Sequence, residues 1–277
     1  MISKQWKNIN YISKVNNCLI KYEAAVAGGV PIIKIIDEFL ISNKISRIYG
    51  ILNGTSNFIL TKMLTTEKNF NEILKEAQKL GYAEADPTFD IDGIDTAHKL
   101  SILSSLAFNV DSELHRIKTE GIRNIDLLDL KFADSLGYKI KLLGISEIEN
   151  RVIKNYVYPC LVEKDNFIAN VDGVYNGVVV ESDFCNKSFF QGEGAGSFPT
   201  ATSVFSDIKS ILDSEPSHLK RPKNNNVRFS KPEKRFGKYY LRFSTDDKPG
   251  VISGIAKEFK KNNISMKSML QEDSKVI

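Results

Sequence analysis

Five carboxylates and one lysine lie within sixteen residues of the sequence, from position 84 to position 99. The acids follow neither the helical nor the strand period, so they do not form one solvated face of a regular element. A lysine that is partly buried beside acids can have a strongly shifted pKa, and such groups collect at functional sites. We therefore interpret this segment, with its acids Glu84, Asp86, Asp90, Asp92 and Asp95 and with Lys99, as a candidate functional segment.

The second half of this segment predicts a helix. Pro87 and Gly93 favour a loop before it, and a helical pattern runs from about position 93 to position 108. Asp95 and Lys99 lie four residues apart on one face of that helix. The same face continues with apolar residues, namely Ile102, Leu103 and Leu106. We expect the ion pair to be partly buried; an ordinary surface ion pair is the alternative.

The composition is that of a soluble globular protein. The 277 residues are 42% hydrophobic and 26% charged, which suits one large domain or two. A formal net charge of +4 does not argue for nucleic acid. Three widely spaced cysteines predict a reducing, cytoplasmic location without a disulfide framework or a zinc site. We expect neither a signal peptide nor a membrane span, because no apolar run approaches the ~18 residues that a span needs.

Strand and helix patterns alternate along most of the chain. The expected helices cover about positions 31–40, 58–64, 70–80, 93–108, 126–136 and 199–212. The expected strands are 46–52, 138–145, 151–162, 167–171, 177–182 and 187–190. Helices followed by several nearly consecutive strands predict an α/β (α+β) fold with a mixed sheet and flanking helices.

The last sixty or so residues have a different character. Residues 214–238 are rich in proline and in basic side chains, and we interpret them as a solvated basic linker rather than a nucleic-acid contact. A strand over 239–245, a helix from about position 250 and a strand over 265–270 would then form one βαβ unit. One such unit has too few strands to bury a sheet face alone.

Two glycine-bearing turns are candidate ligand sites. Residues 192–200 follow an expected strand and precede an expected helix, so they form either a tight turn or a wall against which a ligand packs. Their G-x-G-x-G pattern is not a dinucleotide fingerprint, and the chain contains no Rossmann βαβ unit. In residues 23–31, the carboxylate of Glu23 and backbone carbonyls could surround a hard cation.

Together, four segments of the sequence resemble the homoserine dehydrogenase family. They are residues 22–33, 50–60, 80–88 with Asp95 and Lys99, and 192–200. Members of that family interconvert L-homoserine and L-aspartate 4-semialdehyde with NAD or NADP, on the route to threonine and methionine. Hydride transfer from an alcohol requires a base within hydrogen-bond reach of the alcohol oxygen, and a lysine can serve if desolvation lowers its pKa.

The resemblance implies a role for each site residue. Lys99 would be the general acid/base, Glu84 and Asp95 would bind homoserine with Asp90 in support, and Thr55 and Tyr82 would line the substrate pocket. Glycines would face the nicotinamide end of NAD or NADP, and a sodium ion would bind the Glu23 side chain and three backbone carbonyls. The glycines are Gly81, Gly194 and Gly196, and the carbonyls are those of Val26, Gly28 and Val30.

The resemblance also predicts the domain organisation. Residues 1–213 would be the catalytic and dimerisation domain, 214–238 the linker, and 239–277 part of an ACT-like domain. A homodimer or homotetramer is expected. The family's Rossmann half has no counterpart here, so we expect weak NAD(P) binding and little turnover from this chain alone. Two alternatives are a non-catalytic amino-acid-binding or regulatory module, and one half of a split enzyme whose Rossmann half is a separate polypeptide.

Overall fold

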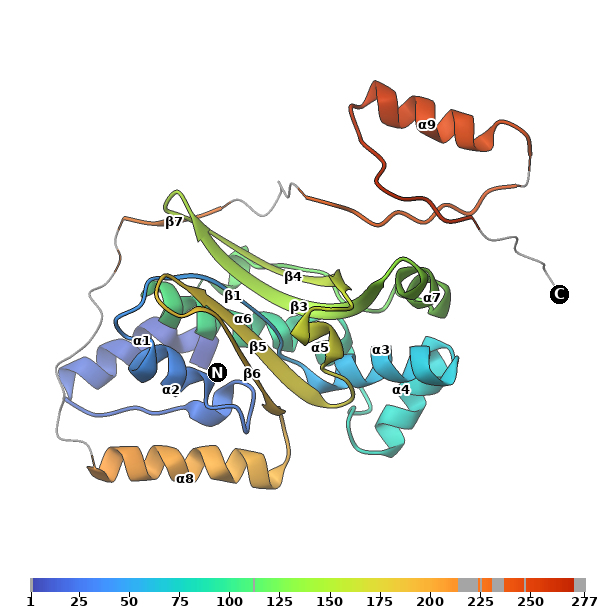
Figure 1. Ribbon diagram of the computed structural model, residues 1–277. Helices are drawn as coiled ribbons and strands as arrows, with labels where there is room; N and C mark the ends of the chain where they lie inside the picture. The colour runs from blue at the N-terminus through green and yellow to red at the C-terminus, as the bar shows by residue number, and fades with distance from the viewer. Residues whose placement is uncertain are drawn as a thin grey trace.

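One mixed β-sheet organises the fold (Figure 1). The computed structural model describes residues 2–111, 113–213, 224, 226–230, 237–246 and 248–271. The sheet has the strand order β2-β4-β3-β1-β5-β6, and β7 also pairs with β4. β2 and β7 run parallel to β4, and the other pairs are antiparallel. The predicted α/β fold with a mixed sheet is confirmed. The strands are β1 Ile45–Ile51, β2 Lys118–Thr119, β3 Tyr138–Glu149, β4 Val152–Glu163, β5 Tyr175–Ser182, β6 Asn186–Glu193 and β7 Arg228–Phe229.

Most of the helices lie on one side of the sheet in Figure 1. Among the described residues, none of them is long and apolar enough to cross a membrane. The α-helices are α1 Ile2–Val15, α2 Ile32–Lys34, α3 Gly54–Thr66, α4 Phe70–Lys79, α5 Thr88–Ile91, α6 Ile94–Phe108, α7 Leu127–Ser135, α8 Ser197–Asp213 and α9 Val251–Lys261. Short 3-10 helices are η1 Glu23–Ala25, η3 Leu114–Arg116 and η4 Phe167–Asn170, and η2 Ile35–Phe39 is a π-helical turn that continues α2.

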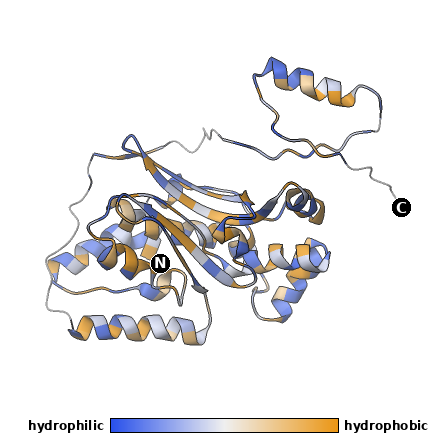
Figure 2. Cartoon of the chain, in the orientation of Figure 1, coloured by the Kyte–Doolittle hydropathy of each residue, from blue (hydrophilic) through white to orange (hydrophobic). Residues whose placement is uncertain are grey.

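The two faces of the sheet are covered differently. Successive strand residues point to opposite faces, so Ile48 and Leu142 join the large core under the helices, while Tyr49 and Leu143 join a smaller core under η4. α6 lies in the large core and packs on β1, β3 and β4. Figure 2 shows the mixture of apolar and polar residues along α8, whose apolar residues are partly exposed. Helix α6 contains the end of the acidic segment and packs on three strands, so it connects that segment to the sheet.

Helix boundaries follow local sequence signals. Asn53 caps α3 and Asn69 caps α4, because each side-chain oxygen accepts a hydrogen bond from a backbone N–H in the first turn. Gly93 precedes α6 with φ +78°, and a Cβ there would lie 3.0 Å from the Val157 side chain. A residue with a side chain would therefore be strained at this junction. The sequence did not predict α1, and it placed the start of α3 four residues too late.

Two expectations, one about a strand and one about the linker, are wrong. Residues 167–171 were expected to form a strand, but Asn166 accepts the N–H of Ile168 and starts the 3-10 helix η4 instead. Within the expected linker, Arg228–Phe229 is not a solvated connector, because it forms β7 beside β4 and Phe229 packs against the large core. Most of the remaining linker lies outside the described residues.

The C-terminal segment contains its predicted helix, α9, but not its predicted strands. Residues 239–245 and 264–271 have no strand structure where they are described (Figure 1). Two strands and one helix bury too little apolar surface to hold a ladder together, which explains the difference. The assignment of this segment to an ACT-like domain stays a prediction.

The C-terminal segment contacts the N-terminus of α7. Asp126 and Asp129 form a capping box there, in which the side chain of each accepts from the backbone N–H of the other. Arg242 forms ion pairs with both carboxylates, and its Nε lies 3.1 Å from Asp129 Oδ1. The Tyr240 hydroxyl donates to the same oxygen at 3.0 Å. These bonds attach the C-terminal segment to the sheet domain through a largely buried acid, Asp129.

We expect the Arg242→Gln substitution to loosen this attachment. A partly exposed ion pair contributes at most ~1 kcal/mol, so proteolytic cleavage of the C-terminal segment should become up to about fivefold faster while the sheet domain stays folded. Limited proteolysis at low and high salt measures this effect. Lys248→Gln is the control, because the pair that Lys248 forms among the described residues is with exposed Asp246 in the same segment. Equal cleavage rates for wild type and Arg242→Gln would contradict the prediction.

Candidate active site

The Lys99 side chain lies at the C-terminal end of the central strand β1. Its Nζ is 2.7 Å from Asp95 Oδ2 and donates to the Leu52 carbonyl at 2.9 Å. The side chains of Lys99 and Asp95 are each 20% exposed. The predicted partly buried ion pair is confirmed, and the surface alternative is wrong. An ammonium group in this position has two fixed acceptors and keeps one side open to solvent.

Asn53, the residue after Leu52, links this ion pair to a second acid. Its side-chain nitrogen donates to Asp90 Oδ1 at 2.8 Å and to Asp95 Oδ2 at 2.9 Å. The Ser56 hydroxyl donates to the backbone carbonyl of Asp90 at 2.8 Å. Residues from the β1–α3 junction therefore fix both acids. An asparagine before a helix is a common cap, but its local sequence does not indicate a bridge to two distant acids.

The carboxyl group of Asp90 is half-buried among charges. Burial raises its pKa above the ordinary value, and the nearby charges of Asp95 and Glu84 add to the rise. The hydrogen bond from Asn53 and the charge of Lys99 oppose it. Glu84 itself is exposed, and Gln78 donates to its backbone carbonyl at 3.1 Å. Glu84, Asp90, Asp95 and Lys99 therefore form one electrostatic cluster.

The other two acids of the segment belong to a different group. Asp92 forms an ion pair with Arg123 through both carboxylate oxygens, at 2.7 and 3.1 Å. Asp86 accepts the N–H of Thr88 and thereby supports the start of α5. These bonds give Asp86 and Asp92 structural partners. The acidic segment is thus divided between a cluster around Lys99 and a cluster around Arg123.

Thr55 and Tyr82 lie beside each other at the start of α3. The Thr55 hydroxyl donates to the Tyr82 carbonyl at 2.6 Å, and the Tyr82 ring contacts Phe58 edge-on. Gly81, directly before Tyr82, lies in the left-handed region at φ +77°, and a Cβ there would meet open space. Its conformation, rather than crowding, favours glycine. This edge of the site has exposed surface on which a small ligand can lie.

The glycine loop between β6 and α8 contacts the segment that contains Glu23. Gly29 donates its N–H to the Glu193 carbonyl at 2.8 Å, and a Cβ on Gly28 would lie 2.7 Å from the Gly194 carbonyl. A Cβ on Gly194 would overlap the buried Asn176 amide at 2.2 Å. Gly196 has φ +114°. Glycine is therefore required at 194 and 196, and the loop presents bare backbone as a ligand wall does.

Glu23 is a buried acid that caps a helix. Its two carboxylate oxygens accept the N–H groups of Ile33 and Lys34, each at 2.9 Å. Burial raises its pKa, although these two hydrogen bonds lower it. The Ser203 hydroxyl donates to the Gly28 carbonyl, and the Val30 carbonyl accepts the N–H of Ile32. Each oxygen has further lone pairs, so a hard cation fits the chemistry of this set but would share its ligands with internal hydrogen bonds.

Comparison with known proteins identifies the family. The model of the homoserine dehydrogenase family matches residues 31–208. Homoserine dehydrogenases of Neisseria gonorrhoeae and Pseudomonas aeruginosa are 40% and 42% identical to the chain over 98% and 92% of its length. The chain belongs to the homoserine dehydrogenase family. It spans 65% and 61% of the length of these two relatives.

Solved structures of homoserine dehydrogenases share the fold. The enzyme from Thiobacillus denitrificans has a TM-score of 0.84 and 39% identity, over 98% of this chain and 65% of the other. A hyperthermophilic archaeal homoserine dehydrogenase, solved in complex with NADPH, has a TM-score of 0.65 and 30% identity. That alignment covers 76% of this chain and 61% of the archaeal chain. The recognition made from four sequence segments is confirmed.

A second buried lysine was missed in the sequence. Lys141 on β3 is 2% exposed, and its Nζ bonds the Val171 carbonyl at 2.6 Å, Asp172 Oδ1 at 2.8 Å and Asn57 Oδ1 at 3.2 Å. Asn57 lies one turn into α3, so this network anchors the helix that Asn53 caps. Burial lowers the pKa of Lys141, while Asp172 opposes that shift. The alternating pattern of β3 predicted a strand but not a charged residue inside it.

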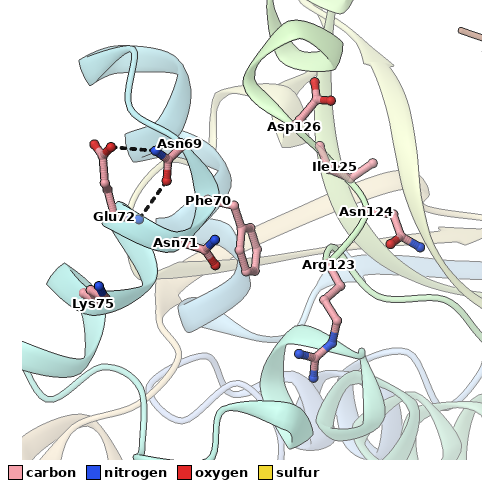
Figure 3. A pocket seen from close by; sticks show the side chains of 9 residues that line it. All are labelled: Asn69, Phe70, Asn71, Glu72, Lys75, Arg123, Asn124, Ile125 and Asp126. Atoms are coloured by element: carbon pink, nitrogen blue, oxygen red, sulfur yellow. Dashed lines mark hydrogen bonds between the residues drawn. The ribbon is translucent and has the colours of Figure 1, made fainter. Parts of the chain in front are cut away.

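A separate hollow lies between the start of α4 and the segment before α7 (Figure 3). Phe70 from the start of α4 and Arg123 from the segment before α7 are among the residues that line it. Among the described residues, its lining contains none of the site residues predicted for the homoserine dehydrogenase reaction. Within that same part of the chain there is also no group of three or more His, Cys, Asp or Glu side chains that could hold a metal ion. The acidic cluster around Lys99 therefore remains the candidate active site.

We expect Asp172→Asn to destabilise the fold through Lys141. Burial raises the pKa of Asp172, but the hydrogen bond and charge of Lys141 outweigh this effect and leave its pKa below the ordinary value. A carboxyl with a lowered folded pKa stabilises the protein above the ordinary pKa of about 3.9, and this stabilisation is lost as the pH falls through the folded value. Because Asp172 is half exposed, the loss at pH 7 should be only about 1–2 kcal/mol.

Urea unfolding at pH 7 and in a series down to pH 3 measures this difference. Asp165→Asn, at an exposed acid in the preceding turn, is the control and should change the free energy of unfolding little. A constant difference between wild type and Asp172→Asn across the whole pH range would contradict the assignment.

Proposed function

We propose that this chain carries the substrate-binding and proton-transfer part of a homoserine dehydrogenase, acting on L-homoserine and L-aspartate 4-semialdehyde. The observation that supports it most is the Lys99 ammonium, held by Asp95 and the Leu52 carbonyl at the edge of an acidic cluster. Lys99 is the general acid/base in this proposal. In its neutral amine form it takes the proton of the homoserine hydroxyl as the alcohol is oxidised, and the ammonium that results returns this proton in the reverse direction.

The charge balance of the cluster favours an amino-acid substrate. Glu84, Asp90 and Asp95 contribute three carboxylates, and Lys99 contributes one ammonium. Arg123 is paired with Asp92, so it is not part of this balance. A substrate ammonium group would offset the excess negative charge. In the proposal Glu84 and Asp95 bind the amine and hydroxyl side of homoserine, Asp90 supports them, and Thr55 and Tyr82 line the pocket.

The proposal also includes a cofactor and a cation. NAD or NADP would supply the hydride acceptor, with its nicotinamide end against Gly81, Gly194 and Gly196. The bare backbone at these three positions supports this placement, as does the archaeal relative solved with NADPH. A sodium ion would bind Glu23 and the carbonyls of Val26, Gly28 and Val30; the burial of Glu23, which disfavours its bare charge, supports a nearby cation. We also propose a homodimer or homotetramer and a cytoplasmic location.

The ligand preference of the purified chain tests the proposal. We expect wild type to bind L-homoserine more tightly than L-2-aminobutyrate, which lacks the hydroxyl group, because Lys99 and Asp95 recognise that group. Lys99→Met should reduce this preference to about twofold or less, since it leaves the hydroxyl without its ionic partner. Asp95→Asn should weaken both ligands by about tenfold, because it removes a charge opposite the ammonium group. Isothermal titration calorimetry measures all of these affinities.

Lys131→Met is the control, because Lys131 forms an exposed pair with Glu67 at the C-terminal end of α3, away from the start of that helix. Threonine binding without homoserine binding would instead support the amino-acid-binding or regulatory module. We expect little homoserine-dependent NAD(P)H production by the chain alone. Production at ordinary enzyme rates would contradict that expectation, and a rise in activity on adding a separate Rossmann polypeptide would support a split enzyme.

A further inference from the structure

One side-chain amide contacts both carboxylates nearest Lys99. Asn53 Nδ2 donates one hydrogen to Asp90 Oδ1 at 2.8 Å and the other to Asp95 Oδ2 at 2.9 Å. The residue is 6% exposed, so these bonds are shielded from water. The two hydrogens of a planar amide point in fixed directions. The bridge therefore sets the separation and the relative orientation of the two acids.

The orientation of the Asn53 amide is fixed from its other end. Its Oδ1 accepts the N–H of Ser56 at 2.8 Å and caps α3. A flipped amide would place an oxygen against two carboxylates and a nitrogen against a donor, which loses every bond. The cap and the bridge thus use the oxygen and both N–H hydrogens of the Asn53 amide.

Helix capping alone does not explain an asparagine here. Serine, threonine or aspartate would cap α3 as well, because each offers an acceptor oxygen to the first turn. Only an amide also provides two donors for two acids. Asn69 provides the comparison, since it caps α4 in the same way but on the surface, where its nitrogen bonds the single carboxylate of Glu72.

The bridge leaves part of each acid unused. Asp95 Oδ2 is shared by Asn53 and Lys99, and Asp90 Oδ1 is bonded to Asn53. In the described part of the chain, no hydrogen bond involves Asp95 Oδ1 or Asp90 Oδ2. Two carboxylates this close would otherwise repel each other and turn apart. With the amide between them, each keeps one acceptor oxygen for a ligand.

We propose that Asn53 is a positioning residue that holds Asp90 and Asp95 together and leaves one oxygen of each to receive the ammonium group of a small amino acid. This inference rests on the proposed function for the identity of the ligand, and on the Asn53 contacts alone for the clamp. Asn53 acts through the two acids and does not itself contact the reacting atoms. It joins the end of β1, the start of α3 and the start of α6 at one point.

Asn53→Ser tests the clamp, because serine keeps the cap oxygen and removes both amide donors, so that no side-chain group can bridge the two acids with two N–H bonds. The groups that face Asp90 are Asp95 and Lys99 from α6 and Glu84 from the preceding loop. Without the Asn53 donors, the pKa of Asp90 should rise by about one unit or more, as followed by carboxyl carbon NMR titration of the whole chain. The dissociation constant for L-homoserine should rise about tenfold or more.

Two further variants separate positioning from folding. Asn69→Ser removes the matched cap nitrogen on α4 and should change neither the Asp90 titration nor homoserine affinity. Asn53→Asp keeps the size of the side chain and the cap acceptor. Its added negative charge should raise the pKa of Asp90 further. This variant tests the clamp if Asn53→Ser does not fold.

The outcomes are distinguishable. An Asp90 titration that is unchanged in both Asn53 variants overturns the clamp, and an unchanged homoserine affinity beside a shifted Asp90 overturns its role in ligand binding. If wild type binds no homoserine, the proposed function fails, and the Asp90 titration still decides whether Asn53 holds the two acids.

Discussion

The site depends on where the chain places a single ammonium group. Lys99 reaches the Leu52 carbonyl only because α6 packs closely against the centre of the sheet. Gly144 on β3 permits that approach, since a Cβ there would lie 3.1 Å from Thr96 and 3.2 Å from Leu52. The pairing of β1 with β3 at Gly50 and Gly144 brings the strand end and the helix start together. The chemistry at Lys99 therefore depends on a packing distance between a helix and a sheet.

The elements that position the site were largely predictable from the sequence. The helix with Asp95 and Lys99, the long strands of the sheet and the helix after the glycine loop all have strong local patterns, and the structure contains them. The partial burial of Lys99 was predictable as well, because its face of α6 continues into apolar residues. In each case the residues that determine the helix, the strand or the burial lie within one short stretch of the chain.

The contacts between distant segments were not predictable in this way. The Asn53 bridge joins residues 37 and 42 positions apart, and the Lys141 network joins β3 to α3 and to the turn before β5. Local patterns also misassigned residues 167–171, where one asparagine side chain outweighs strand propensity, and the C-terminal segment, where two candidate strands have no sheet to join. A lysine inside a strand or an asparagine before a helix does not reveal its partner.

Three hydrogen bonds couple the segment around Glu23 to the glycine loop and to helix α8. Asp207 of α8 accepts the N–H of Glu23, Ser203 of α8 donates to the Gly28 carbonyl, and Glu193 accepts the N–H of Gly29. Helix α8 begins directly after the loop, so the loop and residues 23–29 are both attached to this helix. A displacement of the glycine loop should therefore also displace residues 23–29, and the reverse.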